Sequence, residues 1–190
     1  MPIDLVAVGC SWGGLAAVGH LLAALPANFP PATVIVQHRA ERRSPLAELL
    51  DHHSPKPVRD VADRERVEAG RVYVAPAGYH LLVDTERFWL STDGPVHHNR
   101  PSVDVLFESA AHAFGPRLAA VVLTGANADG AQGLARVAEM GGLTLVQDPA
   151  SAERDTMPAA ALAAVPDAIV GDLSDLARVL AEAALESDMG

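Results

Sequence analysis

The chain has 190 residues, of which 49% are hydrophobic and 20% charged, a composition typical of one globular domain and not of a disordered segment. Its 14 Lys and Arg residues against 24 Asp and Glu residues give a formal net charge of −10, which disfavours nucleic acids and anionic membrane surfaces as partners. The single cysteine excludes an internal disulfide and fits a reducing compartment. We therefore expect one domain over residues 1–190, located in the cytoplasm.

The first apolar segment, "VAVGCSWGGLAAV" at residues 6–18, predicts a strand followed by a helix. Residues 5–25 contain no Asp, Glu, Lys or Arg, so export signals and a spanning helix are the alternatives. A signal peptide requires a basic N-terminal region, which is missing here, and the apolar run before Cys10 is short for a lipoprotein signal. The Gly13–Gly14 pair and His20 are unfavourable in a spanning helix. We therefore expect no membrane insertion.

Short runs rich in Val and Ile alternate with helical patterns along the rest of the chain. The predicted strands are 5–9, 33–38, 71–76, 118–125, 143–148 and 168–171. The predicted helices are one with an apolar face from Leu15 to Leu25, then 44–53, 102–114, 130–140, 157–164 and 174–185. The expected N-caps are Ser102 and Ser174, and the expected helix stop is Gly141–Gly142.

This alternation predicts an α/β fold: a doubly wound, mainly parallel sheet with helices on both faces. Two segments differ from the pattern. Residues 80–92 alternate about a polar "DTER" turn and predict an antiparallel hairpin. Residues 54–70 are polar and contain prolines, which indicates a surface connection.

Three polar side chains follow predicted strands: Ser11, His38 and Asp129. Because ligands of such sheets bind beyond the carboxyl ends of the strands, where strand order reverses, we expect these side chains to meet at one edge. They are the components of a nucleophilic hydrolase. The histidine would take the serine proton on Nε2, the carboxylate would accept from Nδ1, and backbone N–H groups at a helix start would receive the oxyanion.

Each of these residues also has a simpler structural interpretation. Ser11 is suited to cap the first helix, and Asp129 is suited to cap the helix that follows it. His38 fits a hydrogen-bonded histidine at a strand end, and Cys10 is expected to be a packing residue and not a thiol nucleophile. The carboxylates to consider if Asp129 is only a cap are Asp104 and Asp148.

Residues 9–13, "GCSWG", match the G-x-S-x-G nucleophile elbow. However, α/β-hydrolases place several strands before the elbow and order their triad Ser…Asp…His, whereas the order here is Ser…His…Asp. A nucleotide-binding, Rossmann-like protein is a further alternative, with the glycines of this segment as the phosphate loop. Their spacing departs from the usual fingerprint, and His38 stands where an acidic residue would hold a ribose. The paired histidines lack metal-ligand spacing, so we expect no metal and no cofactor.

Five blocks of sequence, "VGCSWGG", "VIVQH", "HHNRPSVDVLF", "LTGANADGAQG" and "MPAAA", resemble in the same order the catalytic domain of the chemotaxis protein-glutamate methylesterases. The resemblance covers about residues 5 to 180. It implies a doubly wound α/β fold and hydrolysis of glutamate γ-methyl esters on the cytoplasmic helices of chemoreceptors, with some glutamine deamidation. It aligns Ser11 with the nucleophile, His38 with the general base and Asp129 with the orienting carboxylate.

The chain departs from this family at two positions near the expected site. Trp12 replaces a small threonine, and Gly125-Ala126-Asn127 replaces the usual G-M-G. We expect Trp12, Gly13 and Ala126 to form the oxyanion hole and pocket. If their backbone N–H groups bind the oxyanion, the side chains alter access more than chemistry. A receptor-binding module without turnover is therefore an alternative.

The family usually carries an N-terminal receiver domain that restrains the esterase. This chain begins at the first catalytic strand, so we expect no receiver domain in it. It is either a piece of a longer protein or a stand-alone enzyme with different regulation.

Overall fold

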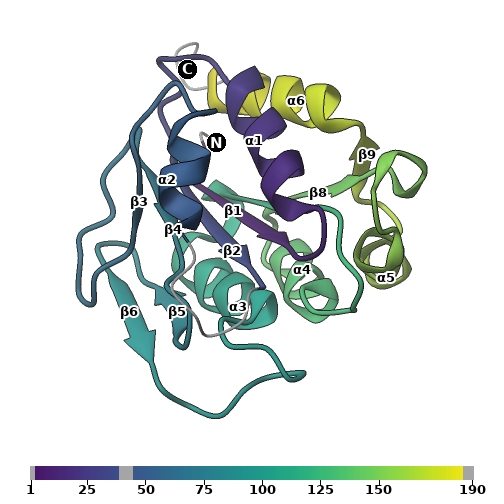
Figure 1. The fold of residues 1–190 in the computed structure, drawn as a ribbon. Helices are drawn as coiled ribbons and strands as arrows, with labels where there is room; N and C mark the ends of the chain where they lie inside the picture. The colour runs from purple at the N-terminus through teal and green to yellow at the C-terminus, as the bar shows by residue number, and fades with distance from the viewer. Residues whose placement is uncertain (1–2, 39–44, 186–190) are drawn as a thin grey trace.

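Seven parallel strands form the central sheet of the computed structural model, which describes residues 3–38 and 45–185 (Figure 1). Their spatial order is β3-β4-β2-β1-β7-β8-β9. The strands are β1 (Leu5–Cys10), β2 (Ala32–Gln37), β3 (Val58–Asp60), β4 (Val72–Val74), β7 (Leu118–Val122), β8 (Leu143–Gln147) and β9 (Ile169–Gly171). A separate antiparallel pair consists of β5 (His80–Val83) and β6 (Phe88–Ser91).

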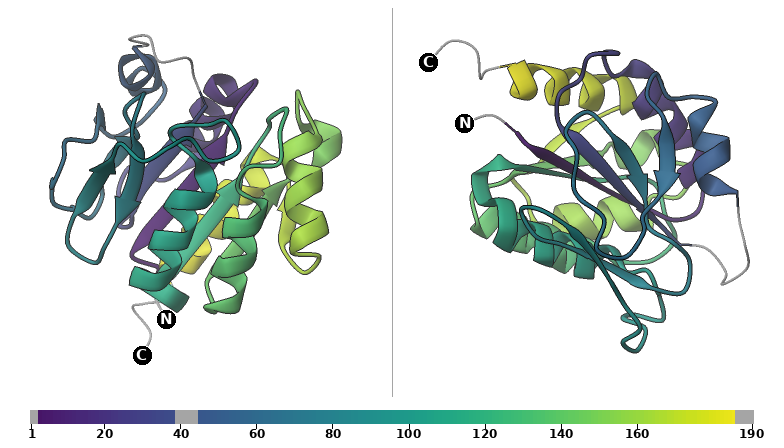
Figure 2. Two further views of the ribbon diagram at one scale, coloured as in Figure 1. Left: turned by 90° about the horizontal axis from the view of Figure 1, so that it is seen from below. Right: turned by 90° about the vertical axis from the view of Figure 1, so that its left-hand side faces the viewer.

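Helices cover both faces of the sheet, as the views in Figure 2 show. One face carries α1 (Gly14–Ala24), α2 (Leu46–Asp51) and α6 (Leu173–Leu185). The other face carries α3 (Val103–Phe114), α4 (Ala131–Glu139), α5 (Thr156–Ala164) and the β5–β6 hairpin. Two short 3-10 turns, Gly115–Arg117 and Pro149–Ser151, complete the connections. The predicted α/β fold class, with helices on both faces and an antiparallel hairpin, is therefore confirmed.

The central strands are apolar throughout because both of their faces are covered. In β1 every residue is buried, with Leu5 and Ala7 in the core under α3 and Val6 and Val8 in the core under α1. This explains why the sequence shows short continuous apolar runs and not a strict polar alternation.

The structure corrects two details of the predicted elements. The stretch 54–70, expected to be a surface connection, contains the edge strand β3, which pairs in parallel with β4. Ser174 is not the cap of α6, because the Asp172 carboxylate accepts from the N–H groups of Ser174 and Asp175. The helix predicted over 44–53 is α2, and residue 44 lies outside the described residues.

The strand order reverses between β1 and β7. From β1 the chain forms β2, the edge strand β3 and then β4 on one side, and it later returns to β7 on the opposite side of β1. The N–H of Ser11 donates to the carbonyl of Thr124 at 3.0 Å, which joins the segments that follow these two strands. The residues beyond β1 and β7 therefore lie at the position where α/β sheets bind their ligands.

Candidate active site

The turn after β1 places Ser11 one residue beyond the sheet. Gly13 adopts a left-handed conformation (φ 76°) and Gly14 donates to the Ser11 carbonyl at 3.0 Å, so the chain turns sharply into α1. The N-cap position of α1 belongs to Gly13, and the Ser11 hydroxyl makes no hydrogen bond within the described part of the chain. Ser11 is thus not a helix cap, and its hydroxyl is available for chemistry.

Cys10 is fully buried under α1. Burial raises the pKa of the Cys10 thiol from 9.0 to about 12. The thiolate that a cysteine nucleophile requires is therefore strongly disfavoured at neutral pH, and Cys10 is a packing residue.

His38 and Asp129 meet beside this turn. The His38 N–H donates to the Cys10 carbonyl at 3.1 Å, which continues the β1–β2 ladder and places His38 next to Ser11 in register. His38 Nε2 lies 2.6 Å from Asp129 Oδ2, and the two side chains are 8% and 0% exposed. No hydrogen bond joins Ser11 Oγ to His38 among the described residues.

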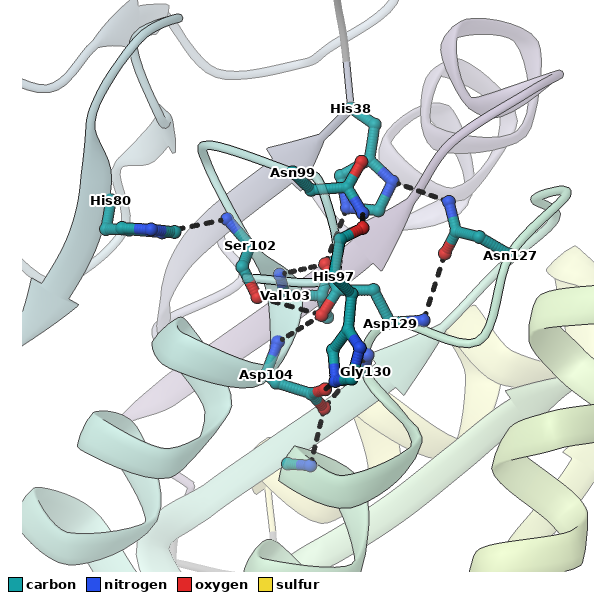
Figure 3. A network of polar contacts seen from close by, with 11 residues as sticks. His38, His80, His97, Asn99, Ser102, Val103, Asp104, Asn127, Asp129 and Gly130 are labelled. Carbon is teal, nitrogen blue, oxygen red and sulfur yellow. Dashed lines mark hydrogen bonds and ion pairs between the residues drawn. The ribbon is translucent and has the colours of Figure 1, made fainter. Parts of the chain in front are cut away.

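The ring of His38 is oriented differently from the expectation. Asp129 was expected to face Nδ1, but it faces Nε2, and Nδ1 lies 2.9 Å from the side-chain nitrogen of Asn127 (Figure 3). The nitrogen left to receive a serine proton is therefore Nδ1.

The Asp129 carboxylate also receives three donors from the start of α3. Oδ1 accepts from the Ser102 hydroxyl at 2.8 Å and from the Asp104 N–H at 3.0 Å, and Oδ2 accepts from the Val103 N–H at 2.7 Å (Figure 3). Asp129 therefore caps α3, whereas the alternative interpretation had it capping the helix that follows it. Burial alone would raise the pKa of Asp129, but the hydrogen bonds from His38 and from these backbone groups outweigh it, so the pKa lies below its ordinary value.

The helix that follows Asp129 is capped by Asp104. Asp104 Oδ1 accepts from the N–H groups of Gly130 at 2.9 Å and Gly133 at 2.7 Å. The two helices therefore exchange caps: Asp129, just before α4, caps α3, and Asp104, in the first turn of α3, caps α4. Asp104 Oδ2 is buried without a hydrogen bond, with His97 Nε2 at 3.8 Å. Burial, followed by the neighbouring charge of Asp129, raises the pKa of Asp104.

Two polar residues that support Asp129 were not predicted as part of the site. Ser102 occupies the expected N-cap position of α3, but its hydroxyl donates to Asp129 and not to the helix. His80 accepts from the Ser102 N–H on Nδ1 at 3.3 Å, and its Nε2 faces the Gly94 carbonyl at 2.9 Å. Ser102 lies in the quoted "RPSVD" block, which was a usable signal, whereas no pattern in the sequence indicates His80.

The other reserve carboxylate, Asp148, accepts from the Ala150 N–H in a 3-10 turn at 2.9 Å. The described residues contain no cluster of three or more His, Cys, Asp and Glu side chains suited to a metal ion. Within the same ranges no helix is long and apolar enough to cross a bilayer.

The side chain of Trp12 lies at the protein surface. Its indole is 59% exposed, its Nε1 donates to Glu153 at 2.8 Å, and the Arg154 guanidinium lies 5.5 Å from its ring centre. The backbone N–H groups of Trp12, Gly13 and Ala126 make no hydrogen bond within the described part of the chain. These three N–H groups are those that the sequence predicts as the oxyanion hole.

Comparison with known proteins assigns the family. Residues 6–180 match the family model described as CheB methylesterase. A relative from Leptospira interrogans is 39% identical over 94% of both chains. A protein-glutamate methylesterase/protein-glutamine glutaminase from Symbiobacterium thermophilum is 43% identical, and the match covers 83% of this chain but 44% of that protein. The crystal structure of the Thermotoga maritima CheB methylesterase catalytic domain superposes with a TM-score of 0.89 at 29% identity, over 96% of this chain and 99% of that one. The chain therefore belongs to the CheB methylesterase family.

Proposed function

We propose that this protein is a serine esterase that hydrolyses glutamate γ-methyl esters on the cytoplasmic helices of chemoreceptors. The observation that carries the proposal is the His38–Asp129 pair at 2.6 Å, set in register beside Ser11 where the strand order reverses. The family match over residues 6–180 supports the reaction class. The name of the relative from Symbiobacterium thermophilum, a protein-glutamate methylesterase/protein-glutamine glutaminase, supports the substrate and includes glutamine deamidation.

In the proposed reaction, Ser11 Oγ attacks the ester carbonyl carbon while His38 takes the hydroxyl proton. The carbonyl oxygen becomes an oxyanion, which the N–H groups of Trp12, Gly13 and Ala126 are placed to receive. Collapse breaks the bond to the methoxy group, which leaves as methanol with the proton from His38. Water then attacks the acyl-Ser11 ester with His38 again as base, and this step releases glutamate and restores Ser11.

Asp129 has two functions in this proposal. Its carboxylate holds Nε2 of His38 and stabilises the imidazolium that forms after proton transfer. Its hydrogen bonds to Ser102, Val103 and Asp104 fix the carboxylate in place. A carboxylate with four donors has little freedom to move, which favours a constant geometry at His38.

The experiment is methanol release from a methylated chemoreceptor by the wild-type chain and by Ser11→Ala. We expect the variant to lose activity on the order of 10⁶-fold, as when a serine hydrolase loses its nucleophile. Its melting temperature should be unchanged, because the Ser11 hydroxyl makes no hydrogen bond within the described residues. Methanol release by Ser11→Ala at a near wild-type rate would exclude Ser11 as the nucleophile. A folded wild-type chain that releases none would favour the binding module without turnover.

A further inference from the structure

Asn127 makes a second connection between His38 and Asp129, in addition to their direct hydrogen bond. It lies in the loop between β7 and α4. Its side-chain Oδ1 accepts from the Asp129 backbone N–H at 3.0 Å, and its Nδ2 lies 2.9 Å from His38 Nδ1 (Figure 3). Asn127 is half-buried, so both contacts are partly shielded from water.

The polarity of these groups determines which nitrogen of His38 carries the proton. A backbone N–H only donates, so the Asn127 oxygen must face Asp129 and the amide nitrogen must face His38. The amide nitrogen only donates, so Nδ1 of His38 must accept. The ring proton is therefore on Nε2, from which it is donated to Asp129 Oδ2. The hydrogen bonds form a closed cycle through Asp129, Asn127 and His38 with one consistent direction.

In this arrangement neither ring nitrogen of His38 is able to take a proton from Ser11. Nε2 is protonated, and the lone pair of Nδ1 already accepts from Asn127. The absence of a hydrogen bond between Ser11 Oγ and His38 in the described residues agrees with this state. Proton transfer from Ser11 therefore requires the Asn127 amide to leave Nδ1.

We propose that Asn127 is a positioning residue that holds His38 in the Nε2–H tautomer at rest and must release Nδ1 before Ser11 loses its proton. This proposal rests on the proposed function, in which His38 is the general base. The hydrogen bond that has to break is a neutral one on a partly buried side chain. Its net contribution predicts a rate penalty of roughly two- to tenfold.

Two substitutions at Asn127 separate the contact with His38 from the contact with the loop. Asn127→Ser keeps an oxygen that accepts from the N–H two residues later, but the shorter side chain does not reach His38. We expect it to raise kcat for methanol release roughly two- to tenfold.

The substitution Asn127→Asp also keeps the loop contact but offers Nδ1 an acceptor in place of a donor. A proton is then retained on Nδ1, and kcat should fall about tenfold or more.

The matched control is Asn28→Asp, which makes the same change of charge on an exposed residue before β2, at the opposite edge of the sheet. We expect its kcat to stay within twofold of the wild-type value. Thermal melting of each variant checks that the loop is intact. Equal kcat values for wild type, Asn127→Ser and Asn127→Asp would overturn the proposal.

Nitrogen-15 NMR of the His38 ring tests the tautomer without turnover. We expect the wild-type ring to be protonated on Nε2 with a bare Nδ1, and the Asn127→Asp ring to carry a proton on Nδ1. A wild-type ring protonated on Nδ1 would overturn the role of Asn127 whatever the activity. Absence of methanol release by the wild type, with the Nε2–H tautomer present, would instead contradict the proposed function, and only the contact by which Asn127 holds this tautomer would remain.

Discussion

At the scale of single residues, Asp129 combines a structural role with the proposed chemical one. Its side chain is fully buried and accepts from His38, the Ser102 hydroxyl and the N–H groups of Val103 and Asp104. Capping and catalysis were competing interpretations of this residue, but its two oxygens are sufficient for both. The cap is on α3, which lies before Asp129 in the chain, so no local pattern around Asp129 predicts it.

The substitution Asp129→Asn should reduce both stability and activity. Asn is ordinarily nearly as good an N-cap as Asp, but here its amide group would face donors that now contact a carboxylate oxygen. Leaving such buried donors unsatisfied costs about 1–3 kcal/mol of unfolding free energy. The amide would also favour the wrong His38 tautomer, a change that lowers kcat about 10⁴-fold in serine proteases.

Urea unfolding and methanol release measure the two effects separately. A loss of stability with kcat within about threefold of wild type would make Asp129 a structural cap only. A loss of kcat with unchanged stability would show that the four donors find other partners.

At the scale of elements, the site depends on the close contact between α3 and α4. Asp104 in the first turn of α3 accepts from Gly130 and Gly133 at the start of α4, while Asp129 in the preceding loop accepts from α3. A Cβ atom at Gly133 would lie 2.7 Å from Phe107 Cβ and 3.0 Å from Asp104 Cα. Only glycine permits this approach of the two helices. The approach brings the Asp129 carboxylate to the start of α3 and the Asp104 carboxylate to the start of α4.

The substitution Gly133→Ala should lower the unfolding free energy by about 1–3 kcal/mol, as expected for overpacking of a tight contact. The control is Gly19→Ala in α1, where a Cβ atom would meet the ring of exposed His53 at 3.3 Å. That side chain is able to move, so the control should be within about 1 kcal/mol of wild type, helped by the higher helix propensity of alanine. Urea unfolding of both variants is the measurement, and equal stabilities would show that α4 shifts without cost.

At the scale of the whole molecule, the site lies where the two halves of the sheet meet. His38 directly follows β2, Ser11 directly follows β1, and Asp129 lies in the loop after β7. The start of α3 crosses the same edge and supplies the donors to Asp129. Four segments that are distant in the sequence thus converge there, and the convergence buries two neighbouring carboxylates, whose pKa values move in opposite directions.

These shifts predict a specific pH dependence of stability. The pKa of Asp104 is raised in the folded state, so its ionised form costs stability at neutral pH, and the cost is relieved as pH falls through the raised pKa. The pKa of Asp129 is lowered, so its stabilising contribution is present above the ordinary value of 3.8 and is lost as pH falls below it. Stability attributable to this pair should therefore be highest at mildly acidic pH.

The measurement is urea unfolding of wild type and Asp104→Asn from pH 7 to pH 4. The asparagine side chain of the variant cannot ionise, so the wild type should gain stability relative to the variant as pH falls over this range. If the stability of the wild type relative to the variant stays constant or falls as the pH falls, the raised pKa of Asp104 is contradicted. Titrating groups that do not interact with Asp104 are shared by both proteins and cancel in the comparison.

The sequence by itself determines the alternation of strands and helices, because apolar periodicity and glycine stops are local properties. Gly141, for example, has a left-handed φ of 78° just after α4, as the predicted helix stop requires. The family blocks likewise identify Ser11, His38 and Asp129 as the residues to examine. The edge strand β3 was missed because three residues, two of them exposed, give no periodic signal.

Only the tertiary structure decides how these residues are connected. The orientation of the His38 ring depends on Asp129 and Asn127, which are 91 and 89 residues away in the sequence. The exchange of caps between α3 and α4 depends on a helix contact that only a buried glycine allows. Hydrogen-bond partners of a buried carboxylate are chosen by distance in space, and a sequence pattern carries no information on that distance until the sheet and its helices have closed around it.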